Sequence, residues 1–491
     1  MPNTSRSSVL RRARTVGATG AGTSLLLAAC STPSTSANDQ TDSTPSVATS
    51  KGTVGGTLNG AVQRFTAIPF AKPPVGQLRW TPPQEPANWN DERPANRPSP
   101  RCAQPISPPY AEGGTPIPAS TTEDCLYLDV TTPAGTTKDA KLPVMVWVAG
   151  GGFKNGAASE YDPSKLVETG KIAVVTINYR LGAFGFLGLP GLDGGGNFGL
   201  LDQTQALHWV QREIAAFGGD PGQVTIAGQS AGGDSMCALL TSPRTEGLFQ
   251  RGILQSSECG DVNVVDTIVP GVGILGDTWR PRKIVDAAGQ AAAKTLGCQG
   301  TPDAVLTCLR GKPANALLDP RFGYFSPAVE TPFLPARPST AIAAGRAHPV
   351  DTVIGYASDE GATLVTGAYT AKALDAAGLR HNAQTIAGPR APQLLAAYSR
   401  PGTAPIRSWA DVVTDRVFAR NPQVAIPRRR SASNLHRSQA TTRALCAASS
   451  APRAARARLG RKAMILSSMP SASRSEGPGA QFDAAASVSS S

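Results

Sequence analysis

The chain has 491 residues, of which 40% are hydrophobic and 17% charged, a balance typical of a globular protein with ample length for a large core. Its formal charge of +12 belongs to the two ends: residues 1–30 carry +4 and residues 421–491 carry +9, which leaves −1 for the residues between. A nearly neutral body has no field that attracts a polyanion, so nucleic acid is not expected as a partner.

The first 30 residues predict an export signal. A basic stretch ending at Arg14 precedes a mostly small and apolar run, which closes in Leu27-Ala28-Ala29-Cys30. This ending resembles a bacterial lipobox, which makes Cys30 the lipidation candidate; a plain secretory signal cut near the same place is the alternative. The apolar run is about half the ~20 residues of a membrane-spanning helix. We expect a secreted or cell-envelope protein, with membrane anchoring through lipidated Cys30 at the outer face of the cytoplasmic membrane.

Residues 31–51 are rich in Ser, Thr, Pro and Asp, and we expect a flexible linker there. A single folded domain is expected over residues 52–420, because strand and helix signals alternate from about Gly52 onward. Residues 421–491 are rich in Arg, Ala and Ser and contain no strand-like apolar run, which predicts a disordered tail.

Cysteine usage agrees with export. Short closed loops suit disulfides in an oxidising compartment, although six cysteines allow fifteen connectivities and buried free thiols are the alternative. Six cysteines fall into three couples that are near in sequence: Cys102 and Cys125, Cys237 and Cys259, Cys298 and Cys308.

The hydrophobic pattern predicts an α/β fold. Residues 201–217 have helical spacing and end at Gly218-Gly219, a natural helix stop. Strands that are apolar throughout and separated by helices point to a mostly parallel sheet covered on both faces. The strand candidates are residues 142–148, 172–177, 224–227 and 353–354.

The strongest chemical signal is Gly228-Gln229-Ser230-Ala231-Gly232. A Gly-x-Ser-x-Gly turn between a strand and a helix projects the serine hydroxyl outward, and glycine on both sides avoids a clash with the neighbouring backbone. Upstream, Gly150-Gly151-Gly152 follows another predicted strand. Backbone N–H groups of such a loop can stabilise the oxyanion of ester hydrolysis, worth about 2.7–4 kcal/mol per donor. A simple flexible glycine loop is the alternative.

Several further motifs occur in a fixed order, and together they resemble the type-B carboxylesterase/lipase family, which includes the cholinesterases. The resemblance spans about Gly52 to Arg420, which implies a catalytic domain over residues 52–420 that lacks the C-terminal part of the family pattern. The motifs are Thr66-Ala-Ile-Pro-Phe-Ala71, Pro73-Pro-Val-Gly-Gln-Leu-Arg-Trp80, Glu123-Asp-Cys-Leu-Tyr-Leu128, Gly150-Gly-Gly-Phe153, Asn178-Tyr-Arg180, Asn197-Phe-Gly-Leu-Leu-Asp-Gln203, Phe217-Gly-Gly-Asp-Pro221 and Gly228–Gly233.

The resemblance implies an α/β-hydrolase fold and a carboxylic ester hydrolase that acts on small-molecule esters through an acyl-enzyme. It implies Ser230 as nucleophile and an oxyanion hole made by Gly151, Gly152 and Ala231. The pairings Cys102–Cys125 and Cys298–Cys308 match disulfides of the family, and Arg79 with Glu123 and Arg180 with Asp202 match its structural ion pairs. No metal or cofactor is predicted, because no His/Cys cluster has ligand spacing.

The acid of the triad should follow the nucleophile, and Ser358-Asp359-Glu360-Gly361 resembles the family's turn at that place. Glu360 is therefore the candidate that orients the catalytic histidine, with Asp359 as its local rival. A solvated acidic turn is the alternative.

The catalytic histidine is not identified. A serine hydroxyl needs a neighbouring base, and the expected Gly-x-x-His stretch is absent after Thr414-Asp-Arg-Val-Phe418. His208 is read as a helix-face residue, while His348 and His381 lie too near Glu360 in the sequence. His436 comes last, but its surroundings resemble nothing in the family.

Two interpretations of this absence remain open. The abrupt loss of resemblance and the concentrated positive charge suggest a shifted reading frame near residue 420; a divergent tail with a true loss of the base is the other interpretation. Two departures are smaller: Ala149 replaces His or Tyr, and Gln229 replaces the usual Glu. The functional alternatives are therefore an active esterase and a catalytically impaired or adhesion-like binding protein on the same fold.

Overall fold

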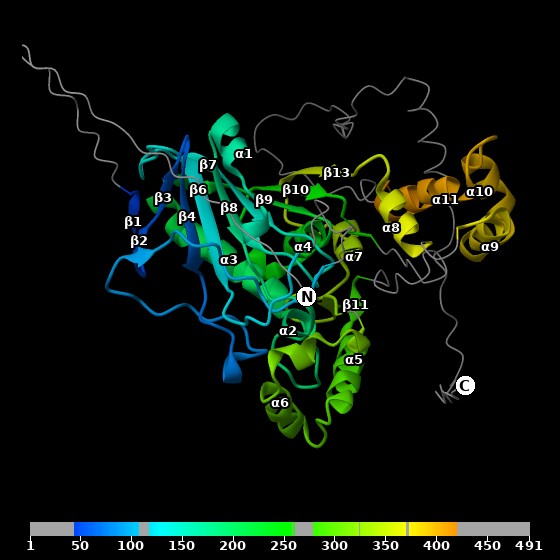
Figure 1. Cartoon of the computed structure of the whole chain (residues 1–491), viewed down its shortest axis with the longest axis horizontal. Coiled ribbons are helices and arrows are strands. Elements are labelled where there is room, and N and C mark those ends of the chain that lie inside the picture. The colour runs from blue at the N-terminus through cyan, green and yellow to red at the C-terminus, as the bar shows by residue number, and fades with distance from the viewer. Residues whose placement is uncertain are drawn as a thin grey trace, which may run out of the picture. The chain divides into compact units, whose positions relative to one another are not determined.

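An eight-stranded mixed sheet forms the centre of the structure, in the order β13-β10-β9-β7-β8-β6-β4-β3 (Figure 1). The strands from β13 to β8 are parallel, and β6, β4 and β3 continue the sheet with antiparallel pairings. The computed structural model describes residues 44–107, 117–257, 259–260, 278–323, 325–369 and 373–419, all within the unit Thr44–Ser491.

The strands of this sheet are β3 (Thr57–Asn59), β4 (Val62–Pro69), β6 (Tyr127–Pro133), β7 (Leu142–Val148), β8 (Ala173–Ile177), β9 (Gly219–Gln229), β10 (Arg251–Gln255) and β13 (Asp351–Gly355). Two small sheets consist of β1 (Ser46–Thr49), β2 (Gly52–Gly55) and β5 (Arg93–Pro94), and of β11 (Arg280–Pro281) and β12 (Ala328–Val329).

The α-helices are α1 (Ser164–Gly170), α2 (Gly182–Phe186), α3 (Phe198–Glu213), α4 (Ala231–Thr241), α5 (Arg282–Thr295), α6 (Pro302–Arg310), α7 (Pro338–Ala343), α8 (Glu360–Ala368), α9 (Ala376–Ala387), α10 (Ala391–Tyr398) and α11 (Pro405–Val413). Short 3₁₀ turns connect several of them, and a π-helical turn, η8 (Thr414–Ala419), follows α11.

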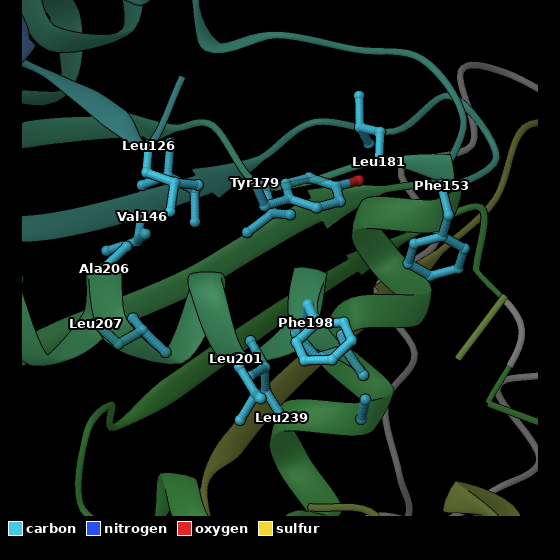
Figure 2. Packing of buried hydrophobic residues seen from close by; sticks show 14 of the residues in the cluster. Leu126, Val146, Phe153, Tyr179, Leu181, Phe198, Leu201, Ala206, Leu207 and Leu239 are labelled. Carbon is cyan, nitrogen blue, oxygen red and sulfur yellow. The ribbon is translucent and has the colours of Figure 1, made fainter. Parts of the chain in front are cut away.

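Helices cover both faces of the sheet. Successive side chains of a strand point to opposite faces, so a strand that is apolar throughout needs a covering layer on each face. On β8, Val175 belongs to the main core with α3 and α4, whereas Val174 packs with Val167 of α1. Figure 2 shows the main core, with Leu201, Ala206 and Leu207 of α3 below the strands. The α/β class and the mostly parallel central sheet are confirmed.

The elements predicted from apolar runs are present at the predicted places. The helix expected over residues 201–217 is α3 followed by a 3₁₀ turn, Ile214–Phe217. The strand at residues 353–354 is part of β13, which lies at the edge of the sheet and leaves Val353 56% exposed. The strand β13 is therefore partly exposed along its length, whereas β8 is buried at every residue.

The predicted linker is wrong over residues 44–51. Here β1 pairs with β2 in an antiparallel hairpin, and both the N–H and the hydroxyl of Ser50 donate to the buried carboxylate of Glu213 at the end of α3. A polar composition predicted flexibility, but a partner 163 residues away in the sequence fixes this segment. Residues 1–43, with the export signal and Cys30, lie outside the described residues, as does the tail from residue 420.

All three predicted disulfides are present: Cys102–Cys125, Cys237–Cys259 and Cys298–Cys308. The two ion pairs are present as well: Arg79 Nε donates to Glu123 at 2.7 Å, and the 0%-exposed carboxylate of Asp202 accepts two bonds from the Arg180 guanidinium at 2.7 and 2.8 Å. Among the described residues, no helix is both long and apolar enough to span a bilayer.

Candidate active site

The predicted site residues follow the carboxyl ends of adjacent parallel strands. Val148, the last residue of β7, is in register with Gly228 near the end of β9, and Gln229 of β9 is in register with Gln255, the last residue of β10. Gln255 is in register with Gly355 at the end of β13. Parallel strands end at one edge of a sheet, so the loops that follow them gather there, the usual place for a ligand site in this architecture.

Ser230 occupies a tight elbow between β9 and α4. Its φ of +54° and ψ of −126° are rarely adopted by residues other than glycine, and its N–H donates to the carbonyl of Gln255 at 2.9 Å. A Cβ at Gly228 would overlap the carbonyl of Gly232, and a Cβ at Gly232 would overlap the carbonyl oxygen of Val148. The two glycines of the motif are thus required by close backbone contacts, as the sequence predicts.

The glycine triplet leaves β7 beside this elbow. Gly151 and Gly152 have φ values of +105° and +62°. In the described part of the chain, neither of their N–H groups donates a hydrogen bond. Ala231 is the first residue of α4, so its N–H has no partner within the helix. These three donors, at a helix N-terminus that favours negative charge, are suited to bind an oxyanion.

Glu360 starts α8 just after β13. Its Oε1 accepts from the N–H of Ala357 at 2.8 Å and from the hydroxyl of Ser256. Its Oε2 has no partner among the described residues, which leaves one oxygen for an imidazole N–H. Asp359, the local rival, instead forms an exposed ion pair with Arg407.

The helix that carries Glu360 is fixed by packing against α11. The N–H of Gly361 donates to Thr414 Oγ1 at 2.8 Å, and a Cβ at position 361 would overlap the carbonyl oxygen of Ala410. The Thr-Asp-x-x-Phe segment thus holds the start of α8, with Thr414 as its contacting residue.

Ser256 is a site residue that the sequence did not predict. It follows β10 with φ +50°, and its N–H donates to the carbonyl of Gly355 at 2.7 Å. Its backbone therefore joins the ends of β10 and β13, while its side chain holds Glu360. The only signal in the sequence is its position one residue after an apolar strand, which is too common to single it out.

None of the three described histidines contacts Ser230 or Glu360. His208 lies on the exposed side of α3, and His381 is exposed on α9. The ring of His348 bonds to Ser242 and Thr245, beyond the far end of α4 from Ser230, and an 11-residue helix is about 16 Å long. Burial lowers the pKa of His348, against the hydrogen bond to Ser242 and the charge of Glu246, which raise it. His436 lies outside the described residues.

Comparison with known proteins places most of the chain in one family. A family described as "Carboxylesterase family" matches residues 43–387. Para-nitrobenzyl esterase of Bacillus subtilis (strain 168) is 37% identical over 401 residues, covering 77% of this chain and 74% of that protein. Pyrethroid hydrolase Ces2a of Mus musculus is 39% identical over 310 residues, covering 61% of this chain and 52% of the relative.

The fold is shared with solved structures. A structure of PNB esterase superposes with a TM-score of 0.60 at 34% identity, covering 77% of this chain and 76% of the other. The chain spans about half the length of several mammalian relatives that it matches, among them Ces2a and the liver carboxylesterase of Sus scrofa, of which 49% is covered.

Proposed function

Because the chain belongs to the carboxylesterase family and has its α/β-hydrolase fold, we propose that it hydrolyses carboxylic esters of small molecules with Ser230 as the nucleophile. The observation that carries the proposal is the elbow: a serine with φ +54° at the end of a parallel strand, between glycines that the backbone packing requires. A protein that only binds has no need of this strained conformation.

The reaction has two stages. Ser230 Oγ attacks the ester carbonyl and gives its proton to a base, and the carbonyl oxygen becomes an oxyanion that accepts from the N–H groups of Gly151, Gly152 and Ala231. The tetrahedral intermediate expels the alcohol, which takes the proton, and leaves an acyl group on Ser230. Water then attacks the acyl-enzyme, releases the carboxylic acid and restores the serine hydroxyl.

The test is turnover of a short-chain p-nitrophenyl ester by the full chain and by Ser230→Ala. We expect Ser230→Ala to lose activity on the order of 10⁶-fold, the loss typical of removing the nucleophile of a serine hydrolase. Turnover that survives in Ser230→Ala would assign the chemistry to another residue. A folded wild-type protein without turnover would favour a binding role on this fold.

The residue that acts as the base is not identified. If it is a histidine, Glu360 Oε2 is the atom that would accept a hydrogen bond from its imidazole. The chain contains four histidines, and the one outside the described residues is His436. If His436 is the base, His436→Gln should reduce turnover about as far as Ser230→Ala. If the reading frame is shifted near residue 420, another frame of the gene should encode a Gly-x-x-His-x-x-Glu-like segment; its absence from both other frames ends that hypothesis.

We also propose export to the cell envelope, with a lipid on Cys30. The three disulfides support an oxidising compartment. Mass spectrometry of the mature N-terminus after expression in a bacterial host tests this: a diacylglyceryl-modified Cys30, and transfer from the membrane fraction to the medium in Cys30→Ser, are expected. An unmodified N-terminus near Cys30 would indicate plain secretion.

A further inference from the structure

The loop that carries the oxyanion donors has a strained backbone. We call residues 149–158 the oxyanion loop. Gly151, Gly152 and Phe153 adopt positive φ values in succession, +105°, +62° and +56°. Phe153 carries a side chain in a conformation that bulky residues rarely adopt, and such strain persists only where the surroundings enforce it. The contacts that enforce this conformation therefore decide where the oxyanion donors point.

Both ends of the oxyanion loop are tied to the turn after β8. The buried hydroxyl of Tyr179 donates to the carbonyl of Ala149 at 2.8 Å, and the side-chain oxygen of Asn178 accepts from the N–H of Ala158 at 2.8 Å. Figure 2 shows Tyr179 and Phe153 in the buried cluster. These bonds fix the ends of the loop but leave its middle to other contacts.

Two contacts hold the middle of the loop: the N–H of Gly182 donates to the carbonyl of Phe153 at 2.7 Å, and the side chain of Gln104 bonds to Gly156. This side chain is 0% exposed; its Oε1 accepts from the N–H of Gly156 at 3.0 Å, and its Nε2 donates to the carbonyl of Gly156 at 3.1 Å. Gly156 in turn touches the glycine triplet, because a Cβ at position 156 would lie 2.5 Å from the carbonyl oxygen of Gly150. A shift of Gly156 would therefore move the oxyanion donors.

Gln104 belongs to the loop closed by the Cys102–Cys125 disulfide. Its second amide proton goes to the carbonyl of Cys102 at 3.0 Å, so the amide is fully hydrogen-bonded. Its backbone forms a bridge with Ser120 across the same loop. A third bond joins the two loops, from Asn155 Nδ2 to the carbonyl of Pro105 at 2.7 Å. Gln104 and Pro105, in the described part of the disulfide loop, thus bond directly to residues 155 and 156 of the oxyanion loop.

We propose that Gln104, which is bonded to the carbonyl of Cys102 beside the Cys102–Cys125 disulfide, is a positioning residue for the oxyanion hole. The proposal rests on the proposed ester hydrolysis for its catalytic consequence. The structural part of the proposal is independent of that reaction. Backbone bonds from Lys154 and Asn155 to the carbonyl of Gly151 hold residues 151–155, and the Gln104 amide adds the hold on both hydrogen-bonding groups of Gly156.

The test compares wild type, Gln104→Ala and Gln104→Glu in the full disulfide-bonded chain. Gln211→Ala is the matched control, because the Gln211 amide also holds two carbonyls, those of Pro221 and Leu248, elsewhere in the fold. The first readout is amide hydrogen exchange of the peptide that covers residues 150–156. We expect exchange there to be about 10-fold faster or more in Gln104→Ala and unchanged in Gln211→Ala.

The second readout is p-nitrophenyl ester kinetics. We expect kcat to fall about 10- to 100-fold in Gln104→Ala with KM within about threefold, because the lost contacts matter for the transition state. Gln104→Glu keeps an acceptor for the Gly156 N–H but places a carboxylate beside the carbonyl oxygens of Gly156 and Cys102. Its kcat should therefore fall at least as far as that of Gln104→Ala. It also serves as the second variant if Gln104→Ala does not fold.

The outcomes separate the two proposals. Absence of turnover in wild type contradicts the proposed function, while the exchange measurement still decides the role of Gln104. Unchanged exchange of residues 150–156 in the Gln104 variants overturns the positioning role, whatever their activity. A fall in kcat equal in Gln104→Ala and Gln211→Ala would also overturn it, because the loss would then follow from general destabilisation.

Discussion

Glu360 depends on one side chain for its position, the hydroxyl of Ser256. A hydrogen bond to a charged group contributes about 1.5–3 kcal/mol, so Ser256→Ala should reduce kcat about 10- to 100-fold with little change in KM. Steady-state kinetics with a p-nitrophenyl ester measures this, and Ser164→Ala, on the exposed helix α1, is the control. A kcat within twofold of wild type would show that Ala357 alone suffices to hold Glu360.

Asp129 on β6 is a buried carboxyl outside the proposed site. Burial raises its pKa, against the hydrogen bonds from Ser99 and the N–H of Ala67 and the charge of Arg64, which lower it. A raised pKa in the folded state means that folding favours the protonated form. The stability from this group is complete below the unfolded pKa, about 3.9, and is lost as pH rises through the folded pKa.

This sign leads to a measurable pH dependence. Relative to Asp129→Asn, which cannot ionise, wild type should lose free energy of unfolding as pH rises from about 4 through the folded pKa. Urea unfolding of both proteins over this range measures the difference. A difference that stays constant with pH, or that moves in favour of wild type, would contradict the raised pKa.

At the scale of elements, the ion pair of Arg180 and Asp202 joins the turn after β8 to α3. Both side chains are at most 3% exposed, and the Asp202 carboxylate also accepts from the Arg180 N–H at 3.0 Å. Removal of one partner leaves an unpaired buried charge, which typically costs about 3–5 kcal/mol. Arg180→Ala should therefore lower the free energy of unfolding by about this amount in urea denaturation.

The double variant Arg180→Met with Asp202→Leu separates the charge from the packing. It removes both charges while keeping most of the volume, so it should destabilise less than Arg180→Ala. The same neighbourhood orients Tyr179 and Asn178. Equal destabilisation by the single and double variants would show that side-chain packing, rather than an uncompensated charge, dominates there.

The central strands could be predicted because strands buried on both faces consist largely of apolar residues. β8 is buried at every residue, and four of its five residues are apolar. Residues 44–51 could not, because their order comes from Glu213, far along the chain. The composition of a segment does not reveal its long-range contacts, and the β1–β2 hairpin depends on such a contact, the hydrogen bonds from Ser50 to Glu213. The role of Gln104 could not be predicted for the same reason, because its hydrogen-bond partner Gly156 lies 52 residues away in the sequence.

In the molecule as a whole, the proposed nucleophile and the proposed acid could be located in the sequence because each lies in a compact motif with a strand before it. The structure confirms the predicted places of the elbow, the triplet and the acidic turn. Ser256 could not be singled out, since its role depends on the register of β10 with β13. Neither the sequence nor the structure identifies the base. The three described histidines lie away from Ser230 and Glu360, and His436 lies outside the described residues.

Covalent labelling of the full chain shows whether Ser230 is a reactive nucleophile. The full chain is treated with a fluorophosphonate, and the modified residue is identified by peptide mass spectrometry. The proposal predicts one adduct, on Ser230, formed far faster than on free serine and absent from Ser230→Ala. A folded protein that carries no adduct, or an adduct on another residue that persists in Ser230→Ala, would contradict it.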